Sequence, residues 1–315
     1  MKILVTPTSF KLDSTTQAML KLRSFASSLV FNPKGRPLSE SELIPLLEGC
    51  DGCIAGLDHY TPRVIKYASN LKVISRYGIG VDRVDLNAAR AKNVVVCNTP
   101  GANIQAVADL TFALLLCIAR RVPVLDCKTR EGLWLRSIGI ELYNKTIGIL
   151  GLGAIGKEVA RRASGFSMKV LAYDPFLDKE YAEANGILPV DFETLIQESD
   201  FLSLHLPLTE QTRHIISAEV MNSMKKGAII VNTARGGLID EDAAYNFLSS
   251  GHLGGLGLDV YEIEPPPKAP LFGLENVVLT PHTAAHTAES MEAMAEMSVQ
   301  NLIDVLSGRD CPYTV

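Results

Sequence analysis

Three polar segments in the second half of the sequence could together transfer a hydride to or from a carbonyl carbon. They contain Arg235, the neighbouring acids Glu262 and Glu264, and His282, and each follows a short apolar run. Hydride transfer to a carbonyl places negative charge on its oxygen, so a proton donor must stand beside it, and histidine titrates near neutral pH. An arginine can bind a substrate carboxylate through two parallel hydrogen bonds and polarise the carbonyl. The segments therefore indicate reduction of a 2-oxo acid.

The acids supply the third part of this chemistry. A carboxylate bonded to the second ring nitrogen of His282 would fix the ring orientation and favour the charged ring. Glu264 and Glu262 both suit this role, and their positions alone do not separate them. Each segment by itself has a structural explanation, as a surface ion pair, a solvated loop or a hydrogen-bonded turn. Only their combination favours catalysis.

A glycine-rich segment after the apolar run 147–150 has the pattern of a dinucleotide-binding turn. Gly151, Gly153 and Gly156 have the spacing G-x-G-x-x-G. The first glycine permits a tight turn, the second lets the backbone approach a pyrophosphate, and the third lets a helix pack close to the strand. A proline-free helix is expected over 157–167, and its N-terminus would favour a bound anion.

Asp174 makes this pattern more specific. It follows a second expected strand, 169–173, at about the distance from the glycines at which a carboxylate binds the ribose of adenosine. Its charge would repel the 2′-phosphate of NADP. The next residues, Pro175, Phe176 and Leu177, include no arginine that could bind that phosphate. The sequence therefore predicts NAD as the cofactor.

Strand and helix signals alternate through the rest of the chain, which predicts α/β domains with parallel sheets. A chain of 315 residues exceeds the usual size of one core, so two domains are expected. We expect a hinge at 99–101 and a long apolar helix after it, at 104–121. Expected strands cover 2–6, 52–56, 71–75, 94–97, 147–150, 169–173, 200–204, 228–232, 256–260 and 277–280. Expected shorter helices cover 41–48, 62–68, 85–91, 192–197, 218–224 and 241–249.

Two further segments each have two interpretations. The loop 76–80 follows an expected strand, and its backbone N–H groups could bind a ligand carboxylate or form a plain turn. Its residues are Arg76, Tyr77, Gly78, Ile79 and Gly80. The segment 131–143 contains Trp134, the only tryptophan of the sequence, and could be a packing arm for a second subunit or a surface excursion.

Composition and charge argue against several function classes. Hydrophobic residues make up 47% and charged residues 21%, as in ordinary globular proteins. The net charge is −5 and the basic residues are dispersed, so no nucleic-acid partner is expected. The longest apolar run, 110–119, is too short to span a bilayer, and the first residues lack a signal-peptide pattern, so we expect a cytoplasmic protein without membrane partners. Cys50 and Cys53 form a C-x-x-C without further zinc ligands, so no metal is expected.

Taken together, these motifs resemble the D-isomer-specific 2-hydroxyacid dehydrogenases. The resemblance covers nearly the whole chain and rests on the segments NTARGGLID, LDVYEIEPPP, LTPHTAAHT and GLGAIG and on the YDP that contains Asp174. Within that family, the chain looks most like 3-phosphoglycerate dehydrogenases in the segments SRYGIGVDRVD, NTPGANIQAVADLTFALLL and LGLGAIGKEVARR. The family implies an α/β fold of two Rossmann-like or flavodoxin-like domains with parallel sheets.

The resemblance also assigns roles to individual residues. The family's catalytic residues fall on Arg235, Glu264 and His282, which selects Glu264 over Glu262. The family's substrate-carboxylate loop falls on 76–80. The cofactor contacts fall on Gly151, Gly153 and Gly156, on Ala154 and Ile155 at the pyrophosphate, on Asp174 at the ribose, on Leu206, Thr233, Ala234, Arg235 and His282, and on Asp259 at the nicotinamide amide.

A domain organisation follows from the same likeness. The last helix, from about 286 to 306, would return to the first domain. This gives a substrate domain over 1–101 and 286–315, with an NAD-binding domain over 102–285 inserted in it. The family implies a homodimer through the cofactor domains. Because the sequence stops at Val315, feedback control by serine through an added domain is not expected.

The expected substrate is a small acidic 2-hydroxy or 2-oxo acid, such as 3-phosphoglycerate. The counterpart of a phosphate-binding arginine lies near Ala55, where no arginine stands, although Arg76, His59 or Arg136 could compensate. The segment PHTAAHT is also closer to D-lactate-type relatives. The missing arginine supports an alternative with the same chemistry, a reductase of hydroxypyruvate, glyoxylate or another small 2-oxo acid. A non-enzymatic NAD(H)-sensing scaffold is a further alternative, but nothing basic or disordered flanks the core to recruit its partners.

Overall fold

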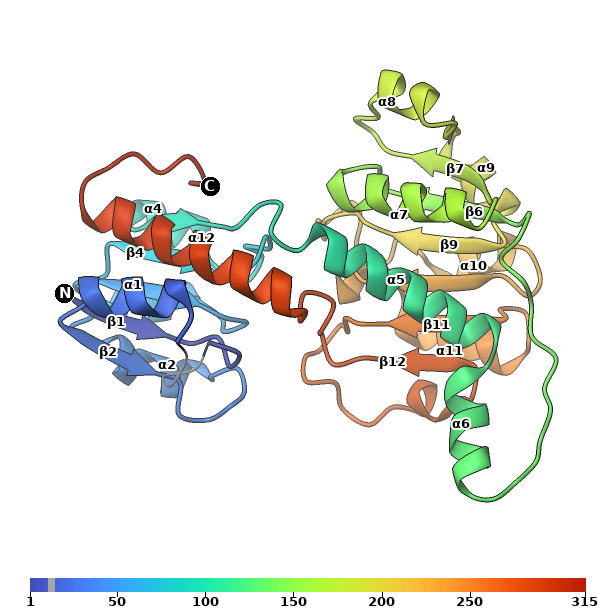
Figure 1. Ribbon diagram of the computed structural model, residues 1–315, viewed down its shortest axis with the longest axis horizontal. Coiled ribbons are helices and arrows are strands. Elements are labelled where there is room, and N and C mark those ends of the chain that lie inside the picture. Colours follow the sequence, from blue (N-terminus) through green and yellow to red (C-terminus); the bar gives the residue numbers. More distant parts are fainter. Residues whose placement is uncertain (11–14) are drawn as a thin grey trace. The chain divides into compact units, whose positions relative to one another are not determined.

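The computed structural model describes residues 1–10 and 15–315 and divides the chain into two compact units. Unit 1 comprises Met1–Asn103 and Ala285–Val315, and unit 2 comprises Ile104–Ala284. Each unit contains one parallel β-sheet with helices packed on it (Figure 1). The expected fold class, α/β with two parallel sheets, is confirmed.

Unit 1 is built on a five-stranded sheet with the strand order β2-β1-β3-β4-β5. Its strands are β1 (Lys2–Val5), β2 (Ser28–Phe31), β3 (Gly52–Ala55), β4 (Val73–Arg76) and β5 (Val95–Cys97). Its helices are α1 (Gln17–Phe25), α2 (Glu40–Leu47), α3 (Pro62–Tyr67), α4 (Leu86–Ala91) and α12 (Ala288–Leu306). Because α12 packs against α1, β3 and β4, the last part of the chain completes the unit formed by the first part.

The strands of unit 1 are apolar on both faces because helices cover both faces. Leu4 of β1 belongs to the core under α2 and α3, together with Leu43. Its neighbours Ile3 and Val5 belong to the core under α1 and α12, together with Leu302. This alternation is the two-residue period of a β-strand. A sheet packed on both sides therefore carries the loops that follow β3 and β4.

Unit 2 is built on a seven-stranded sheet with the strand order β12-β11-β10-β9-β6-β7-β8. Its strands are β6 (Thr146–Leu150), β7 (Lys169–Tyr173), β8 (Leu188–Pro189), β9 (Phe201–Leu204), β10 (Ile229–Asn232), β11 (Gly255–Leu258) and β12 (Val277–Leu279). Its α-helices are α5 (Ile104–Ala119), α6 (Val122–Arg130), α7 (Ala154–Gly165), α8 (Lys179–Ala184), α9 (Phe192–Glu198), α10 (Ala218–Ser223) and α11 (Glu241–Ser249). The strand order reverses beside β6, which has β7 on one side and β9 on the other, and doubly wound sheets bind ligands at the carboxyl ends of strands at such a reversal.

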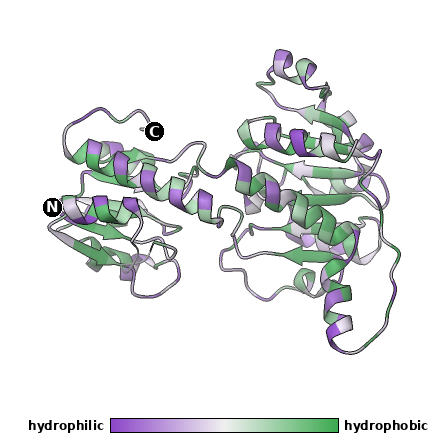
Figure 2. Cartoon of the chain, in the orientation of Figure 1, coloured by the Kyte–Doolittle hydropathy of each residue, from purple (hydrophilic) through white to green (hydrophobic). Residues whose placement is uncertain are grey.

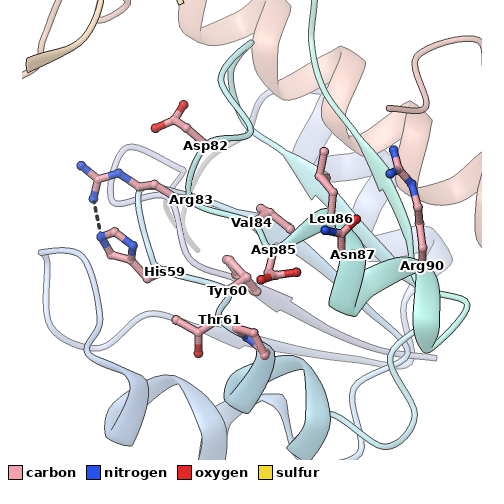
Figure 3. Close-up of a pocket in the computed structure, with 11 residues that line it drawn as sticks. His59, Tyr60, Thr61, Asp82, Arg83, Val84, Asp85, Leu86, Asn87 and Arg90 are labelled. Atoms are coloured by element: carbon pink, nitrogen blue, oxygen red, sulfur yellow. Dashed lines mark hydrogen bonds between the residues drawn. The ribbon is translucent and has the colours of Figure 1, made fainter. Parts of the chain in front are cut away.

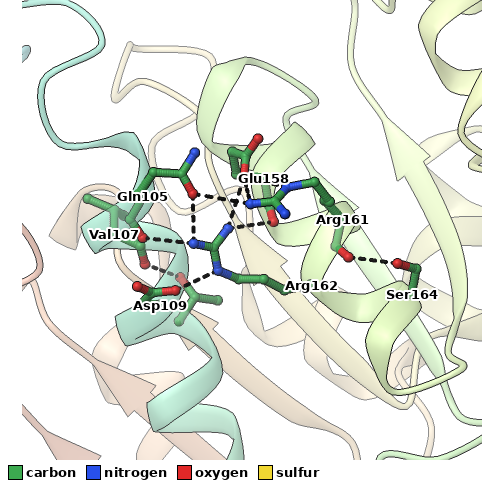
Figure 4. A network of polar contacts seen from close by, with 8 residues as sticks. Gln105, Val107, Asp109, Glu158, Arg161, Arg162 and Ser164 are labelled. Carbon is green, nitrogen blue, oxygen red and sulfur yellow. Dashed lines mark hydrogen bonds and ion pairs between the residues drawn. The ribbon is translucent and has the colours of Figure 1, made fainter.

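Helices α5 and α7 contribute to one core of unit 2, and α9, α10 and α11 contribute to the other. The strands that separate the two cores are largely hydrophobic (Figure 2). Arg162 joins α7 to α5, because its Nε lies 2.7 Å from Asp109 Oδ1 and its Nη2 lies 2.8 Å from Gln105 Oε1 (Figure 4). Its Nη1 also donates to Glu158 Oε2 at 3.0 Å. This network links α7, the helix that follows the glycine-rich turn, to α5.

Several elements differ from the sequence-based prediction. Helix α5 ends at Ala119 rather than 121, since Arg121 adopts a left-handed backbone with φ of 53°, and α6 then begins at Val122. The sequence did not predict α1, β2, α6, α8 or β8. Strands β2 and β8 are sheet edges with partly exposed side chains, so they lack the fully buried pattern of the inner strands. Among the described residues, no helix combines the length and apolar character needed to cross a membrane.

Candidate functional site

The glycine-rich turn between β6 and α7 has the backbone geometry of a ligand cradle. Gly151 has φ of 100°, and a Cβ on it would lie 2.8 Å from the carbonyl carbon and oxygen of His205. A Cβ on Gly156 would lie 2.2 Å from the carbonyl oxygen of Gly151, so α7 can approach β6 only with glycine there. Gly153, by contrast, has no atom within 4 Å of its Cβ position. The turn is therefore tight where it packs and open at Gly153, where a pyrophosphate could approach the backbone.

Asp174 is tied directly to this turn. Its Oδ2 accepts a hydrogen bond from the Leu152 amide at 2.8 Å, and its Oδ1 accepts one from the Phe176 amide at 2.8 Å. The carboxylate thus stands at the carboxyl end of β7, beside the carboxyl end of β6. Each carboxylate oxygen has a second lone pair, so both could also accept ribose hydroxyl groups. The glycine-rich turn and Asp174 therefore fit the adenosine half of NAD.

His282 and Glu264 form the pair that the sequence predicted. The Nδ1 of His282 lies 2.8 Å from Oε2 of Glu264, and since a carboxylate accepts, this nitrogen carries the proton. The other oxygen, Oε1, accepts from the Tyr261 amide at 3.2 Å. The side chain of His282 is 29% exposed and that of Glu264 is 12% exposed. A partly exposed imidazole held through Nδ1 can present Nε2 to a substrate.

Glu262, the alternative carboxylate, binds a different histidine. Its Oε1 lies 2.9 Å from Nε2 of His214, and its Oε2 lies 3.6 Å from Nη2 of Arg213. The two glutamates of one loop therefore serve two separate imidazoles. In this structure Glu264, and not Glu262, is the carboxylate bonded to His282.

Asp259 organises the turn that carries His282. Its Oδ1 accepts from the Thr283 amide and the Thr280 hydroxyl, both at 2.7 Å, and its Oδ2 accepts from the Ala284 amide at 2.9 Å. Its carbonyl oxygen accepts from the His282 amide at 2.8 Å, and His282 has a left-handed φ of 49°. Burial raises the pKa of the Asp259 carboxyl group, while the hydrogen bonds from residues 283, 280 and 284 act in the opposite direction. Sequence reasoning missed this anchoring role, which no spacing signalled.

Arg235 begins a tightly packed loop at the carboxyl end of β10. The loop continues into the short 3-10 helix η1 (Gly236–Leu238). The Nη1 of Arg235 donates to the Ala234 carbonyl at 2.7 Å, and the Arg235 carbonyl oxygen accepts from Asn232 Nδ2 at 2.6 Å. A Cβ on Gly236 would lie 1.9 Å from the carbonyl group of Tyr261, so this loop presses against the loop that carries Glu264. The adjacent strands β10, β11 and β12 thus bring Arg235, Glu264 and His282 to one edge of the sheet.

The predicted carboxylate loop, 76–80, lies in unit 1 after β4. Arg76 is 7% exposed, and its Nη1 donates to the carbonyl groups of Ala55 at 3.0 Å and Tyr77 at 2.8 Å. Gly78 has φ of 137° and donates from its amide to the Thr99 hydroxyl at 3.0 Å. The Arg76 guanidinium therefore links the loop backbone at Tyr77 to the end of β3 at Ala55. This guanidinium is engaged by carbonyl groups, which does not favour a phosphate-binding role.

A pocket of about 510 Å³ lies beside the loops that follow β3 and β4 (Figure 3). His59 and Arg83 line it, and Nε2 of His59 lies 3.4 Å from Nη1 of Arg83. Asp82 and Asp85 line the same pocket, so its charge is mixed. Ala55, the position where phosphate binding was considered, is fully buried in the core of unit 1.

His205 is a residue of the site that the sequence analysis did not single out. It follows β9, and its Nε2 lies 2.7 Å from the Ser203 hydroxyl. Burial lowers the pKa of His205 to about 3, so the ring is neutral at physiological pH. Its carbonyl group packs against Gly151, and its neighbour Leu206 lies beside the same turn. A polar residue directly after an apolar strand was the signal that could have found it.

Comparison with known proteins gives a consistent result. A family model described as "D-isomer specific 2-hydroxyacid dehydrogenase, NAD binding domain" matches residues 112–284, within unit 2. Glyoxylate reductase of Korarchaeum cryptofilum is 42% identical over 287 residues, which cover 89% of this chain and 86% of that protein. The apo-structure of D-lactate dehydrogenase from Escherichia coli is similar with a TM-score of 0.86 at 32% identity, covering 100% of both chains.

A second relative is longer than this chain. D-3-phosphoglycerate dehydrogenase of Methanocaldococcus jannaschii is 44% identical over 275 residues, which cover 86% of this chain and 52% of that protein. The chain thus spans about half the length of this relative.

Proposed function

The chain belongs to the D-isomer specific 2-hydroxyacid dehydrogenase family of NAD-dependent oxidoreductases, and we propose that it reduces a small 2-oxo acid, such as glyoxylate or hydroxypyruvate, to the D-2-hydroxy acid. The observation that carries this proposal is the 2.8 Å contact between His282 and Glu264, beside the loop of Arg235. NADH, when bound, supplies the hydride. The protein must then bind the acid, orient its carbonyl and deliver a proton.

Each of these tasks has a candidate side chain. Arg235 would bind the substrate carboxylate and stabilise the charge that develops on the carbonyl oxygen. His282 would donate a proton to that oxygen from Nε2, and Glu264 would keep the ring in the orientation and charge state that this needs. We assign the substrate-domain role to unit 1 and the NAD-binding role to unit 2. In the loop 76–80, the Tyr77 and Gly78 amides already donate to the Ala55 carbonyl and the Thr99 hydroxyl, so the backbone contacts of this loop with a substrate would come from Ile79 and Gly80.

The cofactor would lie along the carboxyl ends of β6, β7, β9, β10 and β11. Gly153 leaves open space at the head of α7 for the pyrophosphate, and Asp174 stands where a ribose carboxylate is needed. The remaining proposed contacts are Gly151, Ala154, Ile155, Gly156, Leu206, Thr233, Ala234, Arg235, Asp259 and His282.

Replacing Asp174 with alanine should lower the preference for NADH over NADPH by about tenfold or more, because a like charge beside the 2′-phosphate is removed. The measurement is the ratio of kcat/KM for the two cofactors. Asp191→Ala, which removes an acid that caps α9, is a matched control and should leave this ratio unchanged. Unaltered selectivity in Asp174→Ala would refute the assigned role.

The unit 1 loops favour a small substrate over a phosphorylated one. Ala55 offers no cation, and the guanidinium of Arg76 is turned toward carbonyl groups. A second candidate function is oxidation of 3-phosphoglycerate, the first step toward serine, which is supported by the 44% identity to a D-3-phosphoglycerate dehydrogenase. His59, Arg83 and Arg90 line the pocket of Figure 3, and their side-chain nitrogens could then contact a phosphate.

Following the loss of NADH absorbance with a panel of 2-oxo acids tests the proposed function. We expect the highest kcat/KM with glyoxylate or hydroxypyruvate. A preference for 3-phosphohydroxypyruvate would support the second candidate instead. Inactivity with every acid, while NADH still binds, would contradict both and favour an NAD(H)-sensing scaffold.

We also propose a cytoplasmic location. In this compartment thiols stay reduced, such as the buried thiol of Cys53, which contacts the Tyr60 hydroxyl at 2.9 Å.

We further propose that the enzyme is a homodimer that packs through the segment 131–143. This segment exposes several large apolar side chains, among them Trp134 at 83% and Ile138 at 98%. Several large exposed apolar side chains within one segment are typical of a subunit contact. The same segment is fixed to unit 2 by the Ile140 amide, which donates to the Ala119 carbonyl at 2.9 Å.

The double variant Trp134→Asp/Ile138→Asp should be monomeric in light scattering coupled to gel filtration, because each charge would be buried without a partner at the contact. Tyr67→Asp, at an exposed aromatic residue of unit 1, is the control and should remain dimeric. A monomeric wild-type protein, or a double variant that stays dimeric, would contradict the proposed arm.

A further inference from the structure

Lys157 is a cation held at the edge of the proposed adenosine site. It lies in the first turn of α7, directly after Gly156, and its Nζ lies 2.8 Å from Oδ2 of Asp178. The same ammonium stands 4.1 Å from the centroid of the Tyr181 ring. The Lys157 side chain is 27% exposed and that of Asp178 is 50% exposed. Two partners thus fix one side chain that solvent still reaches.

The ion pair spans the two strand ends between which the ribose would sit. Lys157 extends from the helix that follows β6, and Asp178 belongs to the loop that follows β7. That loop begins at Asp174, whose carboxylate is bonded to the Leu152 amide of the glycine-rich turn. The Lys157 ammonium therefore reaches across from the turn to the segment that carries the proposed ribose carboxylate.

A 2′-phosphate on this ribose would need a cation. Lys157 is a cation in the first turn of the helix that follows the glycine-rich turn, but it is paired with Asp178. Proteins that bind phosphate monoesters place lysine or arginine against the phosphate oxygens. Here the hydrogen bond from Lys157 lowers the pKa of Asp178, so the carboxylate is charged and neutralises the ammonium at physiological pH. The contact with Tyr181 favours the same lysine conformation.

We propose that Asp178 is a specificity-determining residue that keeps Lys157 away from the position of a 2′-phosphate, and so adds to the discrimination against NADP made by Asp174. This inference rests on the proposed seating of the adenosine ribose at Asp174. Asp174 discriminates by repulsion, whereas Asp178 discriminates by withholding an attractive charge. Specificity built from both kinds of interaction is a common physical solution.

Asparagine is the substitution that separates this role from a structural one. Asp178 also caps α8, since its Oδ1 accepts from the Tyr181 amide at 3.1 Å. Asparagine caps helices about as well as aspartate, so Asp178→Asn preserves the cap while it removes the charge that holds Lys157. Lys157→Met then removes the ammonium and keeps a flexible side chain of similar length.

The experiment is calorimetric titration of the full-length protein with NADH and with NADPH. Because Asp174 would mask the effect, the variants Asp178→Asn, Lys157→Met and their combination are made in the Asp174→Ala background. Asp178→Asn should tighten NADPH binding by about fivefold, the upper range for one partly exposed charge pair, and change NADH binding by less than about twofold. Adding Lys157→Met should abolish the gain for NADPH.

Two results for NADPH alone would overturn the inference. One is an unchanged NADPH dissociation constant in Asp178→Asn. The other is a gain for NADPH that persists after Lys157→Met, since the ammonium would then not be its source. Equal weakening of both cofactors would also count against it, because this outcome marks a purely structural role. A wild-type protein that fails to bind NADH would overturn the proposed function itself and the inference with it.

Discussion

Replacing His282 with alanine lowers kcat for 2-oxo acid reduction by about a hundredfold or more, because the variant lacks the proton donor at the developing alkoxide. NADH binding should change much less than kcat, since the glycine-rich turn and Asp174, which would hold the adenosine half, keep their structure. The measurement is steady-state turnover of NADH under saturating substrate, alongside a calorimetric dissociation constant for NADH.

The chain contains a matched control for this variant. His214 is also bonded to a glutamate of the same loop, with its Nε2 2.9 Å from Oε1 of Glu262, but it is a different pair from the one assigned to catalysis. His214→Ala should therefore lower kcat by less than about tenfold, as expected for loss of one partly exposed contact. Wild-type turnover in His282→Ala would remove this histidine from the mechanism.

The second large effect is expected at Glu264. Glutamine in its place keeps the size of the side chain and an oxygen for the Tyr261 amide, but it removes the negative charge that faces Nδ1 of His282 at 2.8 Å. The charged imidazole then loses its counter-charge and the ring loses its fixed orientation. We expect kcat for reduction to fall by at least about tenfold, measured at several pH values.

Glu262→Gln is the control for this substitution, two residues away in the same loop. Its partners are His214 and Arg213, so its effect on kcat should be small. A larger loss in Glu262→Gln than in Glu264→Gln would reverse the assignment. Retention of full activity in Glu264→Gln at every pH would exclude the carboxylate from the reaction.

The parts of the structure that the sequence predicted are those with a strong local signal. Strands β6, β7 and β10 are buried on both faces, and their apolar runs mark them within one residue of the observed bounds. The G-x-G-x-x-G spacing has a direct steric cause, since a Cβ at Gly156 would lie 2.2 Å from a backbone oxygen. Placing Arg235, Glu264 and His282 after consecutive parallel strands was enough to predict that they share one edge of the sheet.

The parts that could not be predicted depend on contacts between distant segments. Glu262 and Glu264 have the same chemistry and lie two residues apart, so only the positions of His214 and His282 distinguish them. The anchoring role of Asp259 depends on a turn that begins more than twenty residues later in the chain. Edge strands such as β2 gain part of their stability from pairing with β1, which their own sequence does not report.

The most direct test of hydride transfer uses NADH deuterated at both C4 positions, with hydroxypyruvate as the acceptor. The product is separated by chiral chromatography and analysed by mass spectrometry. We predict D-glycerate that carries a single deuterium at C2, formed by the wild-type enzyme and about a hundredfold more slowly by His282→Ala. Binding of NADH without deuterium in any 2-hydroxy acid, or label found in L-glycerate, would contradict the proposed reaction.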